Sequence, residues 1–212
     1  MIKAIVFDID GVLIDSFEAN LKFYQTLMPR VGYKAPTRKE YQSLFHYHLW
    51  GVIEALTKAP TKEIQRIWDI GSSREVPYPD ELIKTTPGLY ETVDKLAKKY
   101  KLGVVTNRVK MGIEESPVLQ KLAKHFHTVI TYEDTKNHKP HPEPLLLACK
   151  RLEVEPSESV YVGDVENDIK TGKAAGTKTL LFANKIADNP DAFTSGFTDI
   201  PNIIRTLERT GS

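Results

Sequence analysis

Short apolar runs that lack a polar face recur along this chain, and they constrain its fold more than any other feature. Five of them are predicted to be buried strands, at residues 2–7, 102–106, 128–130, 159–162 and 179–182. From Leu89 onward they alternate with segments of helical apolar spacing. Such alternation indicates a parallel sheet that is covered on both sides. We therefore expect an α/β protein with a doubly wound parallel sheet core and helices on both faces.

Residues 16–86 interrupt this alternation, because they offer amphipathic helices and no convincing strand. Ser16 is a candidate N-cap for a helix that Pro29 ends. Further apolar helical faces are predicted at residues 41–52 and 61–68. The sequence thus predicts an all-helical module inserted after the first strand.

The first apolar run delivers two carboxylates, Asp8 and Asp10, into a turn at Gly11. Alternate residues of a strand share a face, so the two side chains lie on one side if the strand persists that far. Two like charges held close are costly unless a cation or a shared proton relieves them. Ligands of doubly wound sheets bind beyond the carboxyl ends of the strands, so the pair marks a candidate site.

Three further polar segments follow later strands and are expected to meet the acidic pair at the same edge of the sheet. Thr106 and Asn107 offer a hydroxyl and an amide, which suit hydrogen bonds to an oxyanion. Lys139 lies in a proline-stiffened loop, where it supplies a compact positive charge for a phosphate. If a helix starts promptly after Gly163, Asp164 and Asp168 lie on one side of its first turn.

In this order, the segments resemble the four motifs of the haloacid dehalogenase-like hydrolase superfamily, and the resemblance covers essentially the whole chain. The matching residues are Asp8, Asp10 and Gly11 for D-x-D-G, Thr106 for the strand-ending Thr or Ser, Lys139 for the lysine, and Gly163, Asp164 and Asp168 for G-D-x-x-x-D. Each motif alone is weak. Their joint occurrence in the correct order is specific.

The position of the helical module, between the first and second motifs, resembles the branch of this superfamily with a small helical cap. That branch includes phosphoglycolate phosphatases, related pyrophosphatases and beta-phosphoglucomutase. The resemblance implies a Rossmann-like catalytic core, formed by residues 1–15 and 86–212, and a helical cap at residues 16–85. A cap that closes over the site excludes water, so a small phosphorylated metabolite is the expected substrate.

The resemblance also implies a catalytic role for each side chain. Asp8 would attack phosphorus to give an aspartyl-phosphate. Asp10 would protonate the leaving alcohol and then deprotonate the attacking water. Thr106, the main-chain amide of Asn107, and Lys139 would hold the phosphoryl oxygens.

Mg²⁺ is the cofactor that the resemblance implies. It would be held by Asp8, the main-chain carbonyl of Asp10, and Asp164, with Asp168 ordering the surrounding groups. Dehalogenating members carry no acid at the position of Asp10, since a departing halide needs no proton, and the ion-pumping ATPases carry threonine there. Asp10 therefore favours phosphatase or phosphomutase chemistry.

The leading hypothesis is a Mg²⁺-dependent phosphatase similar to phosphoglycolate phosphatases. The alternatives are a sugar phosphomutase of the beta-phosphoglucomutase kind and an inorganic pyrophosphatase of the same family. The cap lacks the arginine-containing segment associated with the sugar-phosphate mutases, which weakens the first alternative. A non-catalytic phospho-switch of the receiver-domain kind is disfavoured, because receivers are much shorter, lack a cap and carry the phosphoacceptor on a later strand.

Composition constrains partners and compartment. A net charge of +1 and the absence of a long Lys/Arg block argue against nucleic-acid or membrane-surface binding. Asp8 and Asp10 interrupt the first apolar run far short of a signal peptide or membrane span. The single cysteine, Cys149, forms no internal disulfide and fits a reducing compartment. We expect a cytoplasmic monomer or small homo-oligomer whose partner is a small phosphorylated metabolite.

The sequence also predicts the surroundings of four other residues, although no motif includes them. Arg108 follows the predicted phosphate-binding turn and is expected to be a surface residue. His48 shares an apolar helical face with Phe45, which predicts a packed histidine. His46 and Trp50 lie on another face and are candidates to line the substrate cleft.

Overall fold

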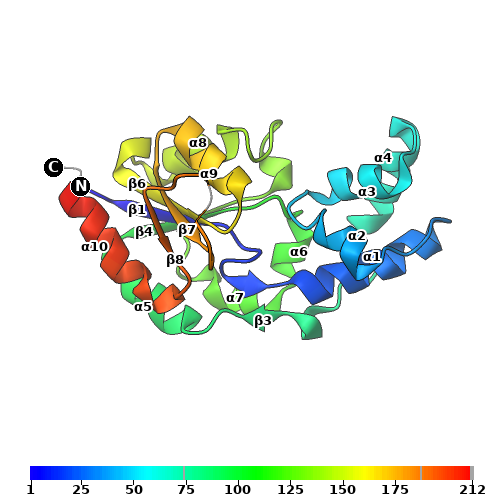
Figure 1. Ribbon diagram of the computed structural model, residues 1–212, viewed down its shortest axis with the longest axis horizontal. Helices are drawn as coiled ribbons and strands as arrows, with labels where there is room; N and C mark the ends of the chain where they lie inside the picture. The colour runs from blue at the N-terminus through cyan, green and yellow to red at the C-terminus, as the bar shows by residue number, and fades with distance from the viewer. Residues whose placement is uncertain (74, 187, 211–212) are drawn as a thin grey trace.

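A parallel sheet forms the centre of the computed structural model, which describes residues 1–73, 75–186 and 188–210 (Figure 1). Within these residues the sheet has six strands in the order β5-β4-β1-β6-β7-β8, and every neighbouring pair is parallel. The strands are β1 (Ala4–Phe7), β4 (Lys101–Val105), β5 (Thr128–Ile130), β6 (Ser159–Gly163), β7 (Lys178–Phe182) and β8 (Ala192–Thr194). Because β1 lies between β4 and β6, the residues that follow it emerge near the middle of the carboxyl edge.

Alternate residues of β1 pack against helices on opposite faces of the sheet. Ile5 and Phe7 belong to one buried cluster, and Ala4 and Val6 belong to another. The first cluster includes residues of α5 (Leu89–Ala97), α7 (Pro117–Ala123) and α10 (Ile200–Thr210), and the second includes residues of α8 (Glu143–Leu152) and α9 (Glu166–Ala175). Both faces of the sheet are therefore covered, which confirms the predicted doubly wound α/β fold.

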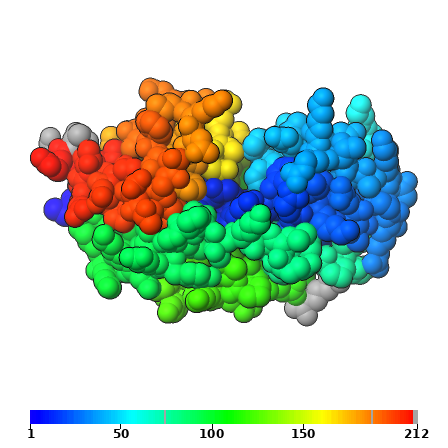
Figure 2. All heavy atoms as spheres, turned by 60° about the horizontal axis from the view of Figure 1, so that its bottom comes forward, coloured from blue at the N-terminus to red at the C-terminus, as the bar shows by residue number. Residues whose placement is uncertain are grey.

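A separate hydrophobic cluster belongs to the helices inserted after β1. These are α1 (Phe17–Arg30), α2 (Arg38–Gln42), α3 (Leu49–Thr57) and α4 (Thr61–Gly71). Leu27, Ile53 and Ile67 are fully buried within it. In Figure 2 this helical cap, coloured blue to cyan, forms a lobe beside the core. The cap thus has its own apolar interior, as the amphipathic patterns predict.

The cap helices differ from expectation at two places. Helix α1 continues through Pro29 and ends at Arg30, because a proline in the last turn costs less than one in a helix interior. Residues 41–52, expected to form one helical face, are divided between α2 and α3. His48 begins the second of these helices, since its Nδ1 accepts a hydrogen bond from the N–H of Gly51 at 3.2 Å.

Three short strands were not predicted. Strands β2 (Ile14–Asp15) and β3 (Lys84–Thr85) pair antiparallel where the chain leaves the core and where it returns from the cap. Two residues are too few to produce an alternating pattern. Strand β8 also has few residues and lies at the edge of the sheet, where Phe193 is exposed. The β2-β3 pair ties the two connections between core and cap together.

The remaining helical segments are short. They are α6 (Met111–Glu114) and the 3₁₀ helices at Asp80–Leu82, Tyr132–Asp134, Pro156–Glu158 and Phe197–Asp199. Across the described residues, no helix combines the length and apolar character that a bilayer span requires.

Truncating a side chain in the central strand is expected to destabilise the protein strongly. Ile5 is 0% exposed, so Ile5→Ala leaves a cavity and lowers the free energy of unfolding by about 2–5 kcal/mol. Leu146, which is 42% exposed on α8, is the matched control, and Leu146→Ala changes that free energy by no more than about 0.5 kcal/mol. Urea unfolding measures both. Equal losses in the two variants would contradict the assignment of Ile5 to the core.

Candidate active site

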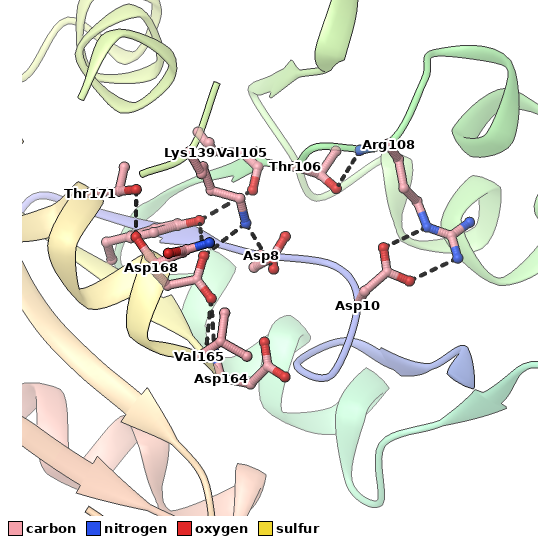
Figure 3. Close-up of polar contacts among 12 residues, drawn as sticks. Asp8, Asp10, Val105, Thr106, Arg108, Lys139, Asp164, Val165, Asp168 and Thr171 are labelled. Carbon is pink, nitrogen blue, oxygen red and sulfur yellow. Dashed lines mark hydrogen bonds and ion pairs between the residues drawn. The ribbon is translucent and has the colours of Figure 1, made fainter. Parts of the chain in front are cut away.

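The four motif segments converge at the carboxyl edge of the sheet (Figure 3). Asp8 directly follows β1, Thr106 follows β4, and Asp164 follows β6. Lys139 reaches the same edge from the loop before α8. These four side chains line one cavity. They meet because β4, β1 and β6 are neighbours in the sheet and run in the same direction.

Lys139 is a buried cation between two carboxylates. Its Nζ lies 2.8 Å from the carboxylate of Asp8 and 2.7 Å from that of Asp168, and its side chain is 5% exposed. Burial by itself would lower the pKa of Lys139. The charges of Asp168 and Asp8 outweigh burial and hold that pKa well above its ordinary value. The ammonium group of this cavity-lining residue therefore stays charged.

Asp168 fixes the groups around it. It is fully buried in the first turn of α9 and accepts hydrogen bonds from the N–H of Asp164 at 3.1 Å and of Val165 at 3.3 Å. Its carboxylate also accepts from the hydroxyl of Tyr161 at 3.0 Å and from Lys139. Asp168 thus holds both the lysine and the main chain that carries Asp164.

Three carboxylates form a compact donor set. Oxygen atoms of Asp8, Asp164 and Asp168 lie within 4.8 Å of one another. Burial raises the pKa of Asp8 to about 7, with Lys139 opposing the shift and Asp168 and Asp10 adding to it. Burial and the charges of Asp168 and Asp8 raise the pKa of Asp164 well above its usual range. Three hard oxygen donors this close together fit a divalent cation such as Mg²⁺, which would relieve the repulsion between their charges.

Two glycines leave the space that this cluster needs. A Cβ at Gly11 would overlap the carboxylate of Asp164, and a Cβ at Gly163 would overlap the side chain of Asp168. Gly11 also has a left-handed backbone, with φ of +81°. The glycines of D-x-D-G and G-D-x-x-x-D are therefore required by close approach of the acidic side chains.

Thr106 and Asn107 lie where the sequence places a phosphate-binding turn. Thr106 is buried, and its N–H donates to the carbonyl of Ile130 at 3.0 Å. Its hydroxyl oxygen accepts from the N–H of Arg108 at 3.2 Å. Thr106 and Asn107 both line the cavity that contains Asp8. This turn therefore adds hydroxyl and amide groups to the positive charge supplied from the loop before α8.

The expectation that Arg108 is a surface residue is wrong. Its guanidinium forms a bidentate ion pair with Asp10, with Nε at 2.7 Å and Nη2 at 2.8 Å, and its side chain is only 10% exposed. Burial tends to raise the pKa of Asp10, but the charge and hydrogen bonds of Arg108 outweigh it and hold that pKa below its usual range. One sequence signal was available, since Arg108 lies two residues after Thr106 at an edge rich in acids.

The Asp10–Arg108 pair belongs to a closed ring of hydrogen bonds. Arg108 donates to the hydroxyl oxygen of Tyr78 at 2.9 Å, and Tyr78 donates to Oδ1 of Asn20 at 2.6 Å. Asn20 donates to Oγ of Ser16 at 3.2 Å, and the hydroxyl of Ser16 donates to Asp10. Ser16 and Asn20 lie at the start of the cap, and Tyr78 lies on the segment that leaves it. The ring ties Asp10 to both ends of the cap.

The cavity lies between the carboxyl edge and the cap and has a volume of about 410 Å³. Its core side carries the acids and Lys139, whereas its cap side carries aromatic side chains: Phe23, Tyr24, Tyr41, Phe45 and Tyr78. The sequence named His46 and Trp50 as candidates to line the substrate cleft. His46 does line this cavity, whereas Trp50 is not among the described residues that line it.

His48 differs from expectation in its surroundings. Instead of packing within a continuous helical face beside Phe45, it caps α3 and faces a loop of the core. Its ring centroid lies 5.4 Å from that of His138 and 5.2 Å from that of Tyr132. The helix break before α3 explains the difference, because it turns the histidine out of the apolar face.

Comparison with known proteins identifies the family. The sequence model of the haloacid dehalogenase-like hydrolases matches residues 5–182. The chain therefore belongs to the haloacid dehalogenase-like hydrolases, as the four motifs indicated. It is 30% identical over 220 residues to the pyrophosphatase PpaX of Bacillus cereus (strain G9842), an alignment that covers 99% of this chain and 99% of that protein.

Solved structures agree with this assignment. A HAD-superfamily hydrolase of subfamily IA from Geobacter sulfurreducens is 30% identical, with a TM-score of 0.73 and coverage of 96% of each chain. A predicted phosphoglycolate phosphatase from Haemophilus somnus is 21% identical, with a TM-score of 0.80 and coverage of 96% of this chain and 98% of that one. At that identity the second similarity supports the fold alone.

The contact between His48 and the core is expected to weaken as pH falls. Burial, with a smaller contribution from His138, lowers the pKa of His48 from 6.5 to about 4. The unfolded chain therefore binds a proton at this position more readily between those values, and stability is lost as pH falls from about 6.5 to about 4. His48→Asn keeps a capping oxygen and removes the imidazole.

Urea unfolding at several pH values tests this. The free energy of unfolding of the wild type is expected to fall relative to that of His48→Asn across this window. Parallel curves from pH 7 to pH 4 would contradict the expectation.

Proposed function

We propose that this protein is a Mg²⁺-dependent phosphatase that hydrolyses a small phosphorylated metabolite through an aspartyl-phosphate. One observation carries the proposal: the carboxylate of Asp8 lines a cavity, 2.8 Å from a buried lysine and within a three-carboxylate donor set. A nucleophile, a phosphate-binding cation and a candidate metal site thus share one edge of the sheet. Membership of a hydrolase family supports the same reading.

Asp8 is the proposed nucleophile. An oxygen of its carboxylate would attack phosphorus, the bond from phosphorus to the leaving oxygen would break, and water would later cleave the aspartyl-phosphate. Lys139, Thr106 and the main-chain amide of Asn107 would hold the phosphoryl oxygens. When bound by Asp8, the main-chain carbonyl of Asp10, and Asp164, Mg²⁺ would neutralise negative charge at the phosphoryl group.

Asp10 is the proposed acid and base. Its ion pair with Arg108 holds it as a carboxylate, which is the form that accepts a proton from the attacking water. Donation to the leaving alcohol requires the protonated form. Asp10 would therefore have to release Arg108 and take up a proton before the first step.

The cap has a proposed role in excluding water. The proposed cap contributes the aromatic side chains Phe23, Tyr24, Tyr41, Phe45 and Tyr78 to the lining of the cavity. The hydrogen-bond ring through Tyr78 and Ser16 links the acid and base to this cap. A closed cap would keep water from the phosphoryl group until the leaving alcohol departs.

Pyrophosphate is the second candidate substrate, because PpaX, a pyrophosphatase, is 30% identical to this chain along nearly its whole length. Pyrophosphate and a phosphate monoester place the same phosphoryl group on Asp8. They differ in the leaving group, which is a second phosphate in one case and an alcohol in the other. Measuring phosphate release from pyrophosphate and from a phosphate monoester, each with and without Mg²⁺, decides which of the two is the substrate.

Replacing the nucleophile is expected to abolish turnover. Asp8→Asn keeps the size of the side chain and removes its charge, so Mg²⁺-dependent release of p-nitrophenol from p-nitrophenyl phosphate falls on the order of a thousandfold or more. Asp188→Asn, on an exposed segment away from the cavity, is the matched control and retains activity. Full activity in Asp8→Asn, or equal activity after removal of the metal with EDTA, would overturn the mechanism.

Replacing the proposed acid is expected to have an effect that depends on the leaving group. Asp10→Asn reduces kcat by about 10²–10⁴-fold for an alkyl phosphate, whose alcohol needs a proton to depart. The formation of the aspartyl-phosphate from p-nitrophenyl phosphate is affected less, because p-nitrophenolate leaves without protonation. Burst kinetics with the two substrates measure this step. An equal loss for both leaving groups would contradict the acid role.

A further inference from the structure

The cap side of the cavity is a continuous aromatic wall. The ring of Phe23 lies 5.8 Å from that of Tyr78 and 5.3 Å from that of Tyr24, measured between centroids. Tyr24 lies 5.2 Å from Tyr41, which lies 6.1 Å from Phe45. All five line the cavity opposite the carboxylates. Such a wall favours a ligand that has an apolar or π face.

Two tyrosine side chains in this wall have hydroxyls without a hydrogen-bond partner among the described residues. Tyr24 is 6% exposed and Tyr41 is 2% exposed, and neither hydroxyl hydrogen-bonds any residue that the structure describes. Burial raises the pKa of both phenols, and the charge of Asp10 adds to the shift. The phenols thus stay protonated and lie within electrostatic reach of the proposed acid. Because both side chains line the cavity, their hydroxyls are donors that a hydrogen-bonding ligand in it could use.

The charges of the cavity disfavour a second anion on the substrate. Among its described lining residues, Lys139 and Arg108 are the only lysine or arginine. Lys139 is paired with Asp8 and Asp168, and Arg108 is paired with Asp10. Both cations are therefore held by carboxylates of the protein, and Arg108 becomes free only when Asp10 releases it. A carboxylate or second phosphoryl group placed against the wall would lose its hydration and would gain a charge partner only by taking Arg108 from Asp10.

We propose that the leaving group is an uncharged alcohol with a planar ring, and that nucleoside monophosphates are the substrate class. The ring would stack on the aromatic wall, and its polar atoms would accept hydrogen bonds from Tyr24 and Tyr41. The volume of about 410 Å³ falls in the range of roughly 300–1,000 Å³ typical of pockets that enclose drug-sized ligands. This inference rests on the proposed phosphatase function. Water and the monophosphate would give the nucleoside and orthophosphate, with the bond between phosphorus and the ester oxygen broken.

A substrate panel tests the assignment. With Mg²⁺ present, kcat/KM for adenosine or uridine 5′-monophosphate is expected to exceed that for phosphoglycolate and for pyrophosphate at least about tenfold. Equal or higher values for phosphoglycolate or pyrophosphate would overturn the inference while leaving the phosphatase function intact. A preference for glucose 6-phosphate, whose leaving alcohol is uncharged but not planar, would overturn the planar-ring assignment. Absence of Mg²⁺-dependent release from every substrate would instead overturn the proposed function.

Two conservative variants separate hydrogen bonding from packing. Tyr24→Phe and Tyr41→Phe keep the rings, so each is expected to raise KM for the nucleoside monophosphate about three- to tenfold with little change in kcat. KM for pyrophosphate is expected to stay unchanged in both. Tyr33→Phe, in the cap but outside the cavity lining, is the matched control and leaves all constants unchanged. Unchanged KM for the nucleoside monophosphate in both cavity variants, or an equal rise for pyrophosphate, would contradict the role of the hydroxyls.

Discussion

The buried ammonium group of Lys139 is the interaction on which the architecture of the site depends. Three carboxylates, Asp8, Asp164 and Asp168, lie together in a region of low solvent exposure, and burial together with the neighbouring charges raises the pKa of Asp8 and of Asp164. Lys139 contacts two of them directly. A single lysine leaves an excess of negative charge, and this excess is the physical reason that the cluster suits a divalent cation.

The parallel sheet makes this concentration of charge possible. Carboxyl ends of β4, β1 and β6 meet at one edge, so residues more than 150 positions apart in the chain become neighbours without any strand needing a polar face. The glycines at positions 11 and 163 then allow the acidic side chains to approach the main chain. Apolar packing on both faces of the sheet supplies the rigidity that holds like charges together.

A second ion pair joins the carboxyl edge of the sheet to the cap. Arg108 holds Asp10 ionised, and the hydrogen bonds that continue through Tyr78, Asn20 and Ser16 reach both ends of the inserted helices. Any displacement of the cap relative to the core therefore acts on the partners of Asp10. The proton chemistry proposed for this carboxylate and the opening of the cavity are coupled through the same side chains.

The sequence by itself determined the doubly wound sheet, the helical cap and the family, because buried strands, amphipathic helices and ordered motifs are local patterns. It also named Asp8, Lys139 and Asp164 as candidates, since each follows or precedes an element at a recognisable position. Only the tertiary structure decided the partners. The pairing of Arg108 with Asp10 and the aromatic wall of the cap join segments far apart in the chain, and no local pattern encodes such contacts.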